Sequence, residues 1–235
     1  MLSNATVVDL SAPLSEGTVL WPGESAIEAQ VVDSFETSTS YSRRLSLPEH
    51  VGTHLDAPCH YAPGGLSVSD IPADRLVRPA VVIDISAAIG DDADAELTVE
   101  HVTDHERLHG RVPDGSAVLL RTGWDSRRHD VASYRGSRTE DPRDLHFPGF
   151  GVPAARLLVE DRGVVGLGVD TLGIDPGSAF DTPVHQDVSL PRGVWHLENL
   201  VNLDQVPPTG AWVVVGVPRI VDGSGFPARV LALVP

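Results

Sequence analysis

The chain has 235 residues, of which 41% are apolar, and it contains no long uninterrupted apolar run. We therefore expect one globular domain over residues 1–235 and no membrane-spanning segment. Its 17 basic and 33 acidic residues give a formal charge of −16, which disfavours a nucleic-acid partner because a phosphate backbone requires a basic surface.

The first residues, MLSNATVVDLSAPLSEG, lack the basic region and the continuous apolar region of a signal peptide. We therefore expect a cytoplasmic protein.

Short runs of β-branched residues bounded by turn residues predict six core strands. In chain order these strands are Thr6–Leu10, Ala80–Ile85, Ala117–Arg121, Val164–Val169, Trp212–Val217 and Arg229–Val234. Two segments carry helical signals: Thr98–His109, which stops before Gly110, and Pro153–Glu160, which has a proline in its first turn. Strands therefore outnumber helices.

The whole chain holds 22 glycines and 19 prolines, so we expect irregular segments to fill much of the remaining sequence. Long loops inside a compact domain are often functional, and the longest one runs over Leu47–Pro72. A charged loop over Ser126–Asp144 is expected to be mobile or to contribute to an oligomer contact.

Three imidazoles and one carboxylate lie within the eleven residues His50–His60, whose sequence is HVGTHLDAPCH. These side chains, all at even positions, are His50, His54, Asp56 and His60. A fully extended segment would spread them over roughly 33 Å, too far for one site, and Pro58 would break a helix. We therefore expect a coiled loop that bends at Gly52 and Pro58 and turns these side chains inward.

This set of donors suits Zn²⁺ or Mn²⁺, which accept imidazole and carboxylate ligands together. The single cysteine, Cys59, excludes a multi-cysteine zinc site. The alternative is a loop whose histidines only bond its own backbone, but the density of ligating side chains favours a metal. Farther along, His185 and Glu198 are ordinary polar residues unless they join the first set.

The segment His50–Tyr61 (HVGTHLDAPCHY) resembles the HxGTHxDxPxH signature of the bacterial kynurenine formamidase and "putative cyclase" family, whose relatives include isatin hydrolases. Similarity extends over most of the chain, in LWPGE at Leu20–Glu24, LLRTGW at Leu119–Trp124, GVDTLGIDPG at Gly168–Gly177 and SGFPARVLALV at Ser224–Val234. The resemblance implies an α/β fold with a mixed β-sheet of the swivelling β/β/α type. It also implies a homodimer or a larger oligomer.

By the same resemblance, five side chains would bind metal: His50, His54, Asp56, His185 and Glu198. Asp56 would bridge a first ion, held in the His50–His60 segment, to a second ion held by the downstream pair. His60 would be the catalytic acid/base, and Trp21 would line the substrate pocket. Family members contain either two zinc ions or manganese, so we expect one or two Zn²⁺ or Mn²⁺ ions per chain.

These residue types also support hydrolysis without the resemblance. A divalent ion lowers the pKa of a bound water to about 7 and polarises a carbonyl, and His60 is placed to pass a proton to the leaving nitrogen or oxygen. We therefore expect a metal-dependent hydrolase of an amide, lactam or ester bond in a small aromatic or cyclic substrate, similar to kynurenine formamidase. The alternatives are a metal-dependent cyclase or dehydratase of secondary metabolism and a non-catalytic metal-binding protein.

A competing motif, HERLH at His105–His109, matches the zincin signature HExxH and lies in a predicted helix. However, Gly110 ends that helix directly after the second histidine, and the metzincin extension is absent. Together with His101, these histidines recur every fourth residue, as on one solvated helix face. We therefore favour a surface helix over a protease site.

Nucleophile motifs are also weak. Cys59 is next to His60, but neighbours in an extended segment point to opposite faces, so a buried thiol is the better interpretation. The sequence has no GxSxG motif, no complete dinucleotide fingerprint and no lysine for a Schiff base or a P-loop.

Overall fold

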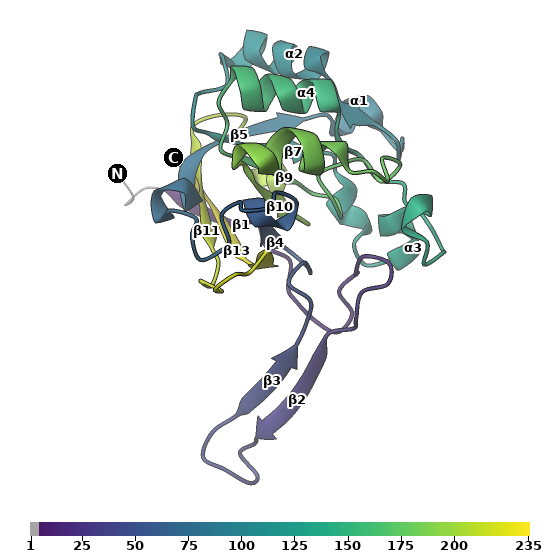
Figure 1. Ribbon diagram of the computed structural model, residues 1–235, viewed down its shortest axis with the longest axis vertical. Helices are drawn as coiled ribbons and strands as arrows, with labels where there is room; N and C mark the ends of the chain where they lie inside the picture. The colour runs from purple at the N-terminus through teal and green to yellow at the C-terminus, as the bar shows by residue number, and fades with distance from the viewer. Residues whose placement is uncertain (1–4) are drawn as a thin grey trace.

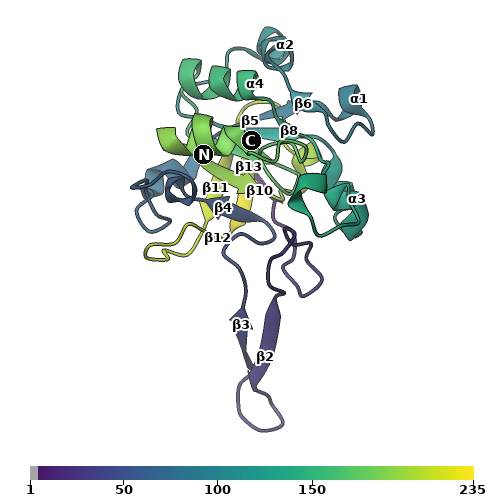
Figure 2. The same cartoon turned by 45° about the vertical axis from the view of Figure 1, so that its right-hand side comes forward.

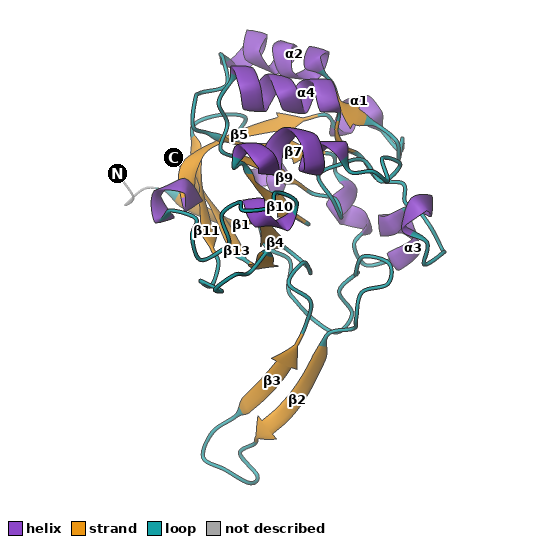
Figure 3. Cartoon of the chain, in the orientation of Figure 1, coloured by secondary structure: helices purple, strands orange, loops and turns teal. Residues whose placement is uncertain are grey.

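The computed structural model describes residues 5–235, and residues 1–4, part of the segment considered for a signal peptide, lie outside the described residues. Within residues 5–235, nine strands form one mixed sheet in the order β1-β13-β11-β5-β7-β9-β10-β4-β12. Two further pairs, β2-β3 and β6-β8, form small separate sheets, of which Figure 3 shows β2-β3. The strands are β1 (Thr6–Asp9), β2 (Glu28–Asp33), β3 (Ser42–Ser46), β4 (His54–Asp56), β5 (Val77–Asp84), β6 (Glu96–Leu97), β7 (Ala117–Arg121), β8 (Gly149–Phe150), β9 (Gly166–Val169), β10 (Trp195–Glu198), β11 (Ala211–Gly216), β12 (Gly225–Pro227) and β13 (Arg229–Val234).

Helical segments are mostly short. The α-helices are α1 (Ser86–Ile89), α2 (Val99–His109), α3 (Val131–Arg135) and α4 (Val152–Arg156). Single turns of 3₁₀ helix occupy Pro58–His60, Ala73–Leu76, Trp124–Arg127, Pro142–Asp144, Leu190–Arg192 and Leu203–Gln205, and π-helical turns occupy Leu157–Asp161 and Val184–Ser189. None of the helices within residues 5–235 has the length and apolar character needed to cross a membrane.

The six predicted strands are confirmed as β1, β5, β7, β9, β11 and β13, and the α/β fold with a mixed sheet is confirmed with them. The predicted helix at Thr98–His109 is α2, with Thr98 as its N-cap. The Thr98 hydroxyl accepts a hydrogen bond from the His101 amide at 3.2 Å, and the His101 ring accepts one from the Thr98 amide at 3.1 Å. This reciprocal cap explains where the helix begins.

Other expectations were incomplete. The charged loop at Ser126–Asp144 contains α3 and buries Tyr134 and Arg135, so part of it packs into the fold. The β2-β3 hairpin and strand β10 were not predicted. Strand β10 has no β-branched residue, and its extended form depends on pairing with β9 on one side and β4 on the other.

The central parallel strands bury both of their faces, which explains why they are continuous apolar runs. In β5, Val81 and Ile83 pack in the core layer beneath α2 and α4, whereas Ala80 and Val82 pack in the core on the opposite face. Figures 1 and 2 show α2 and α4 lying together over one side of the sheet. Helices therefore cover one face, and curling of the sheet encloses the other.

Contacts across the chain show this curl. The residues that follow β1 meet those that follow β10, where a β-bridge joins Ser11 to Leu200 and the Val201 amide donates to the Leu10 carbonyl at 3.0 Å. The Ala12 amide also donates to the Thr53 hydroxyl at 2.9 Å. The curl therefore brings the N-terminal segment against β4 and β10, which carry the candidate site.

Strand β9 tolerates no side chain at Gly166, because a Cβ there would overlap the indole ring of Trp195 on the neighbouring strand. Trp195 is 1% exposed, so its ring has little room to move. We expect Gly166→Ala to lower the free energy of unfolding by about 1–3 kcal/mol, as overpacking does. Chemical denaturation of the purified variant measures this loss.

The control is Gly17→Ala, where the added Cβ would have only the Ser15 hydroxyl nearby, at 3.7 Å. This substitution should change stability by less than about 0.5 kcal/mol. Equal stability of both variants and the wild type would show that Trp195 moves aside without cost.

Candidate metal centre

The site is built on two neighbouring strands, β4 and β10, which pair antiparallel. Their register sets Asp56 opposite His196 and His54 opposite Glu198. Because side chains alternate along a strand, these four residues point to the same face of the sheet. The tertiary structure thus joins the His50–His60 segment to residues about 140 positions away.

The expected bends in the motif are present. Gly52 has a φ of +59°, which favours glycine, and the chain then extends over His54–Asp56. Pro58 begins a 3₁₀ turn that ends at His60. The segment is therefore a short strand between two bends rather than a coiled loop, and its even-numbered side chains do turn toward one cavity.

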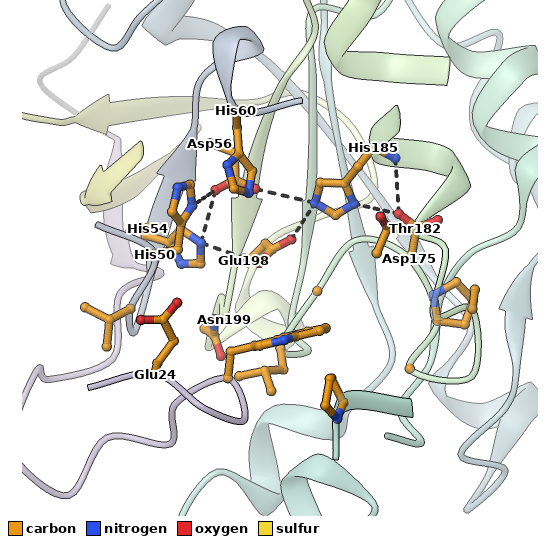
Figure 4. A pocket seen from close by; sticks show the side chains of 18 of the residues that line it. Glu24, His50, His54, Asp56, His60, Asp175, Thr182, His185, Glu198 and Asn199 are labelled. Atoms are coloured by element: carbon orange, nitrogen blue, oxygen red, sulfur yellow. Dashed lines mark hydrogen bonds and ion pairs between the residues drawn. The ribbon is translucent and has the colours of Figure 1, made fainter. Parts of the chain in front are cut away.

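The five predicted metal-binding side chains come together around Asp56 (Figure 4). Asp56 Oδ1 lies 2.6 Å from His50 Nδ1 and 3.1 Å from His54 Nε2, and Asp56 Oδ2 lies 3.6 Å from His185 Nε2. Glu198 lies 3.4 Å from His54 Nε2 and 3.2 Å from His185 Nε2.

Two of these imidazoles are held from behind. His54 donates from Nδ1 to the Gly52 carbonyl at 2.8 Å, and His185 donates from Nδ1 to Asp175 at 2.5 Å. Asp175 is itself fixed, since it also accepts from the backbone amides that begin the π turn. Such contacts fix the tautomer and aim the other ring nitrogen, Nε2, at the centre.

His50 is held in the same manner but through its other nitrogen. The Ser224 hydroxyl donates its proton to Glu49 at 2.6 Å, so it accepts from His50 Nε2 at 2.9 Å. The nitrogen left facing Asp56 is Nδ1. The sequence alone did not identify any of these outer partners.

Buried charge dominates the electrostatics. Burial opposes a charge on His54, yet Asp56 and Glu198 raise the pKa of His54 to about 9. Burial likewise opposes a charge on His185, but Asp175, Asp56 and Glu198 raise its pKa well above the usual range. Burial would raise the pKa of Asp56, but the neighbouring His54 and His50 hold it well below its usual range. The centre therefore attracts positive charge.

One further observation indicates that a divalent metal ion fits this centre. His54 Nε2 is buried and has no partner with hydrogen-bond geometry within the described part of the chain, although two carboxylates lie near it. A buried polar atom without a partner is costly, and an ion between nitrogen and carboxylate would remove that cost. Residues His50, His54, Asp56, His185 and Glu198 are the ones that would hold it.

His60 differs from these imidazoles. Its ring stacks on that of His50 at a centroid distance of 3.9 Å. The backbone amide of His60 donates to the Ala57 carbonyl at 2.9 Å, but the ring makes no hydrogen bond within the described range 5–235. Burial, followed by the nearby His50 and His185, lowers the pKa of His60 to about 4 in spite of Asp56. A neutral ring with free nitrogens beside the centre is able to accept a proton.

A cavity of about 250 Å³ opens over the centre. His60 and Trp21 both line it, and Trp21 contacts Phe147 edge to face with ring centroids 6.4 Å apart. Glu24 and Thr182 also line the cavity and were not predicted. The cavity is large enough for a small aromatic molecule, which fits the expected substrate size.

The structure also places His196, which the sequence analysis did not name, beside the predicted ligands. His196 is fully buried on β10, with Nδ1 3.7 Å from Asp56. The sequence did carry a signal for it, because His196 and Glu198 have the same parity in a strand. That signal required knowing that Trp195–Glu198 is a strand.

The competing HExxH segment forms no site. Glu106 pairs with Arg162 at 2.6 Å, and His101 caps its own helix. His105 is 8% exposed, so the expected solvated histidine face is only partly correct. Within residues 5–235, the groups of side chains that could hold an ion all include Asp56.

Cys59 is half-buried rather than fully buried. Its thiol donates to the Gly223 carbonyl at 3.5 Å and packs against the core, whereas His60 faces the cavity. The two side chains do point apart, so a thiol nucleophile is not supported.

Among curated relatives, the chain is 35% identical to "Isatin hydrolase" of Roseibium aggregatum over 200 residues, covering 81% of this chain and 74% of that protein. It is 31% identical to "Kynurenine formamidase" of Paracidovorax citrulli over 236 residues, covering 97% and 96% of the two chains.

Solved structures give the same picture. Isatin hydrolase A from Ralstonia solanacearum matches with a TM-score of 0.91 and 36% identity, over 99% of this chain and 93% of that one. A structure described as a "potential metal-dependent hydrolase with cyclase activity" matches with a TM-score of 0.74 and 25% identity, over 98% of each chain. The family model described as "Putative cyclase" matches residues 8–176. The chain therefore belongs to this cyclase family, which the HxGTHxDxPxH motif indicated.

Proposed function

We propose that this protein is a metal-dependent hydrolase that cleaves an amide, lactam or ester bond of a small aromatic or cyclic molecule, in the manner of a kynurenine formamidase. The observation that carries the proposal is the meeting of Asp56, Glu198 and several imidazoles at the floor of a cavity lined by an aromatic side chain. Relatives named as isatin hydrolase and kynurenine formamidase support the same reaction class.

The proposed cofactor is Zn²⁺ or Mn²⁺, with one or two ions per chain. His50, His54 and Asp56 would hold the first ion, and Asp56 would share a second with the downstream pair. The donor set of imidazole and carboxylate supports these ions over Mg²⁺ or Ca²⁺, which prefer oxygen ligands. When bound, such an ion supplies a Lewis acid and lowers the pKa of a water to about 7.

Proton transfer and substrate binding would depend on side chains of the protein. The neutral ring of His60, which makes no hydrogen bond within residues 5–235, would take a proton from the attacking water at a ring nitrogen and pass it to the leaving nitrogen or oxygen. Trp21 would hold the aromatic ring of the substrate in the cavity. Its contact with Phe147 supports this role, because the indole ring is already fixed there.

A homodimer or larger oligomer is also proposed, as are a cytoplasmic location and a single domain. The β2-β3 hairpin supports the oligomer, because it projects away from the rest of the chain (Figures 1 and 2). A lone two-stranded hairpin is marginally stable in water. Its apolar side chains are exposed by at least half: Val31 52%, Val32 56%, Phe35 76%, Tyr41 54% and Leu45 50%.

The second candidate is a cyclase or dehydratase, which the structure titled with cyclase activity favours. There the ion would polarise a carbonyl while His60 moves a proton, and water would not attack. Turnover in ¹⁸O-labelled water separates the two reactions. We expect the label in the acid product of an N-aryl formamide or of isatin, whereas unlabelled product would favour the cyclase.

His60→Ala should lower kcat about 10²- to 10⁴-fold, because general acid/base catalysis contributes that much. Bound metal, measured by elemental analysis, should be unchanged. The matched control is His146→Ala, since His146 lies at the surface and its ring is paired with Asp94. Full activity of His60→Ala would remove His60 from the mechanism.

Asp175→Asn should weaken metal binding about 10- to 100-fold, because it removes the carboxylate that orients His185. Competition with a chelator measures the change. Asp187→Asn, an exposed carboxylate on the same turn, is the control.

His109→Asn, in the HExxH segment, should also leave metal content intact, and loss of metal in that variant would revive the zincin interpretation.

Trp21→Leu should raise KM for an aromatic substrate about 2- to 10-fold with little change in kcat, since an aromatic contact is worth about 0.5–1.5 kcal/mol. Steady-state kinetics with an N-aryl formamide test this. Trp212→Leu, at a 47% exposed indole outside the cavity, is the comparison. Equal KM values in both variants would contradict a role for Trp21 in binding.

A further inference from the structure

His196 is placed at the metal centre by the alternation of strand β10. Trp195 and Leu197 point into the apolar core, so His196 and Glu198 point to the opposite face, toward the centre. His196 is opposite Asp56 in the register and is 0% exposed. A histidine that only filled core space would not need this position among carboxylates.

Its hydrogen bonds determine which ring nitrogen carries the proton. The Ser189 hydroxyl donates its single proton to the Val184 carbonyl at 2.7 Å. The same hydroxyl oxygen lies 2.6 Å from His196 Nε2, so it accepts from that nitrogen. In the neutral ring, Nδ1 therefore carries a lone pair.

That lone pair has no hydrogen-bond partner anywhere in residues 5–235, although Nδ1 is buried. The Nδ1 atom lies 3.7 Å from Asp56 Oδ2. His196, Asp56, His185 and Glu198 each offer one ligand atom, and these atoms all lie within 4.8 Å of one another. The ring thus repeats the arrangement of His54, with one nitrogen held from behind and the other aimed at carboxylates.

We propose that His196 is a further metal ligand, binding through Nδ1 the ion that Asp56, His185 and Glu198 hold, with Ser189 as the residue that positions its ring. The inference rests on the proposed function, because it requires an ion at this centre. With His196 the second set has four protein donors, the number typical of closed zinc sites. The first set, with three, would be the one that keeps room for substrate.

The experiment uses the full chain, stripped of metal with a chelator and titrated with Co²⁺. Proton NMR of the loaded protein shows each ligated imidazole as one strongly shifted, exchangeable N–H signal. His196→Gln removes Nδ1 but keeps an amide able to reach Ser189. We expect this variant to lose one shifted signal and to bind its weakest Co²⁺ at least about 10-fold less tightly.

His146→Gln is the matched control, since it makes the same substitution at a partly exposed ring that pairs with Asp94 and belongs to neither group of candidate ligands, and it should keep every shifted signal. Because His196 is fully buried, its substitution can also disturb folding. Ser189→Ala therefore serves as a second variant, which removes only the hydroxyl. There, the signal from His196 should move or exchange faster, and Co²⁺ affinity should fall about 10-fold.

The outcomes separate the two proposals. If the wild type binds no Co²⁺, the proposed function fails together with the inference. If the wild type binds Co²⁺ and the spectra of His196→Gln and Ser189→Ala match it in every shifted signal, the assignment of His196 is wrong while the metal centre stands. Loss of one signal in His196→Gln and its displacement in Ser189→Ala support His196 as a ligand.

Discussion

The structure depends on one buried carboxylate, that of Asp56, which is 1% exposed and surrounded by imidazole rings. Removing such a charge from water is expensive unless positive charge accompanies it. In the protein without metal, neighbouring histidines with raised pKa values supply that charge. A divalent ion would supply it more completely, since it also satisfies the buried nitrogen of His54. The same constraint thus explains both the burial and the attraction for a cation.

The fold surrounds this carboxylate with donors by pairing two short strands that are far apart in the sequence. Strand β4 carries the motif and β10 carries Glu198, and their antiparallel register sets the donors at the spacing of neighbouring strands. Strand β10 is also parallel to β9, so the site is anchored to the central sheet. The curl of the sheet then brings the N-terminal segment with Trp21 over the open side.

A division of roles among the histidines follows from their hydrogen bonds. The rings of His50, His54 and His185 each donate to a fixed acceptor and turn the other nitrogen inward, which is the behaviour of a ligand. The ring of His60 contacts the rings of His50 and Tyr61 but has no hydrogen-bond acceptor among residues 5–235, so it would keep the freedom that proton transfer requires. In the proposed mechanism, one eleven-residue segment would therefore supply both metal ligands and the acid/base.

The sequence by itself determined the family, six core strands and the residues of the HxGTHxDxPxH segment, because apolar runs and closely spaced ligands are local signals. It also predicted helix α2, whose N-cap lies next to it in the chain. It did not determine the partners of those ligands. Asp175, Ser189 and Ser224 are ordinary residues in sequence, and only tertiary contacts place their oxygens behind the imidazoles. Strand β10 became recognisable only through its pairing with β4 and β9, since Trp195 alone among its four residues is of a type enriched in strands.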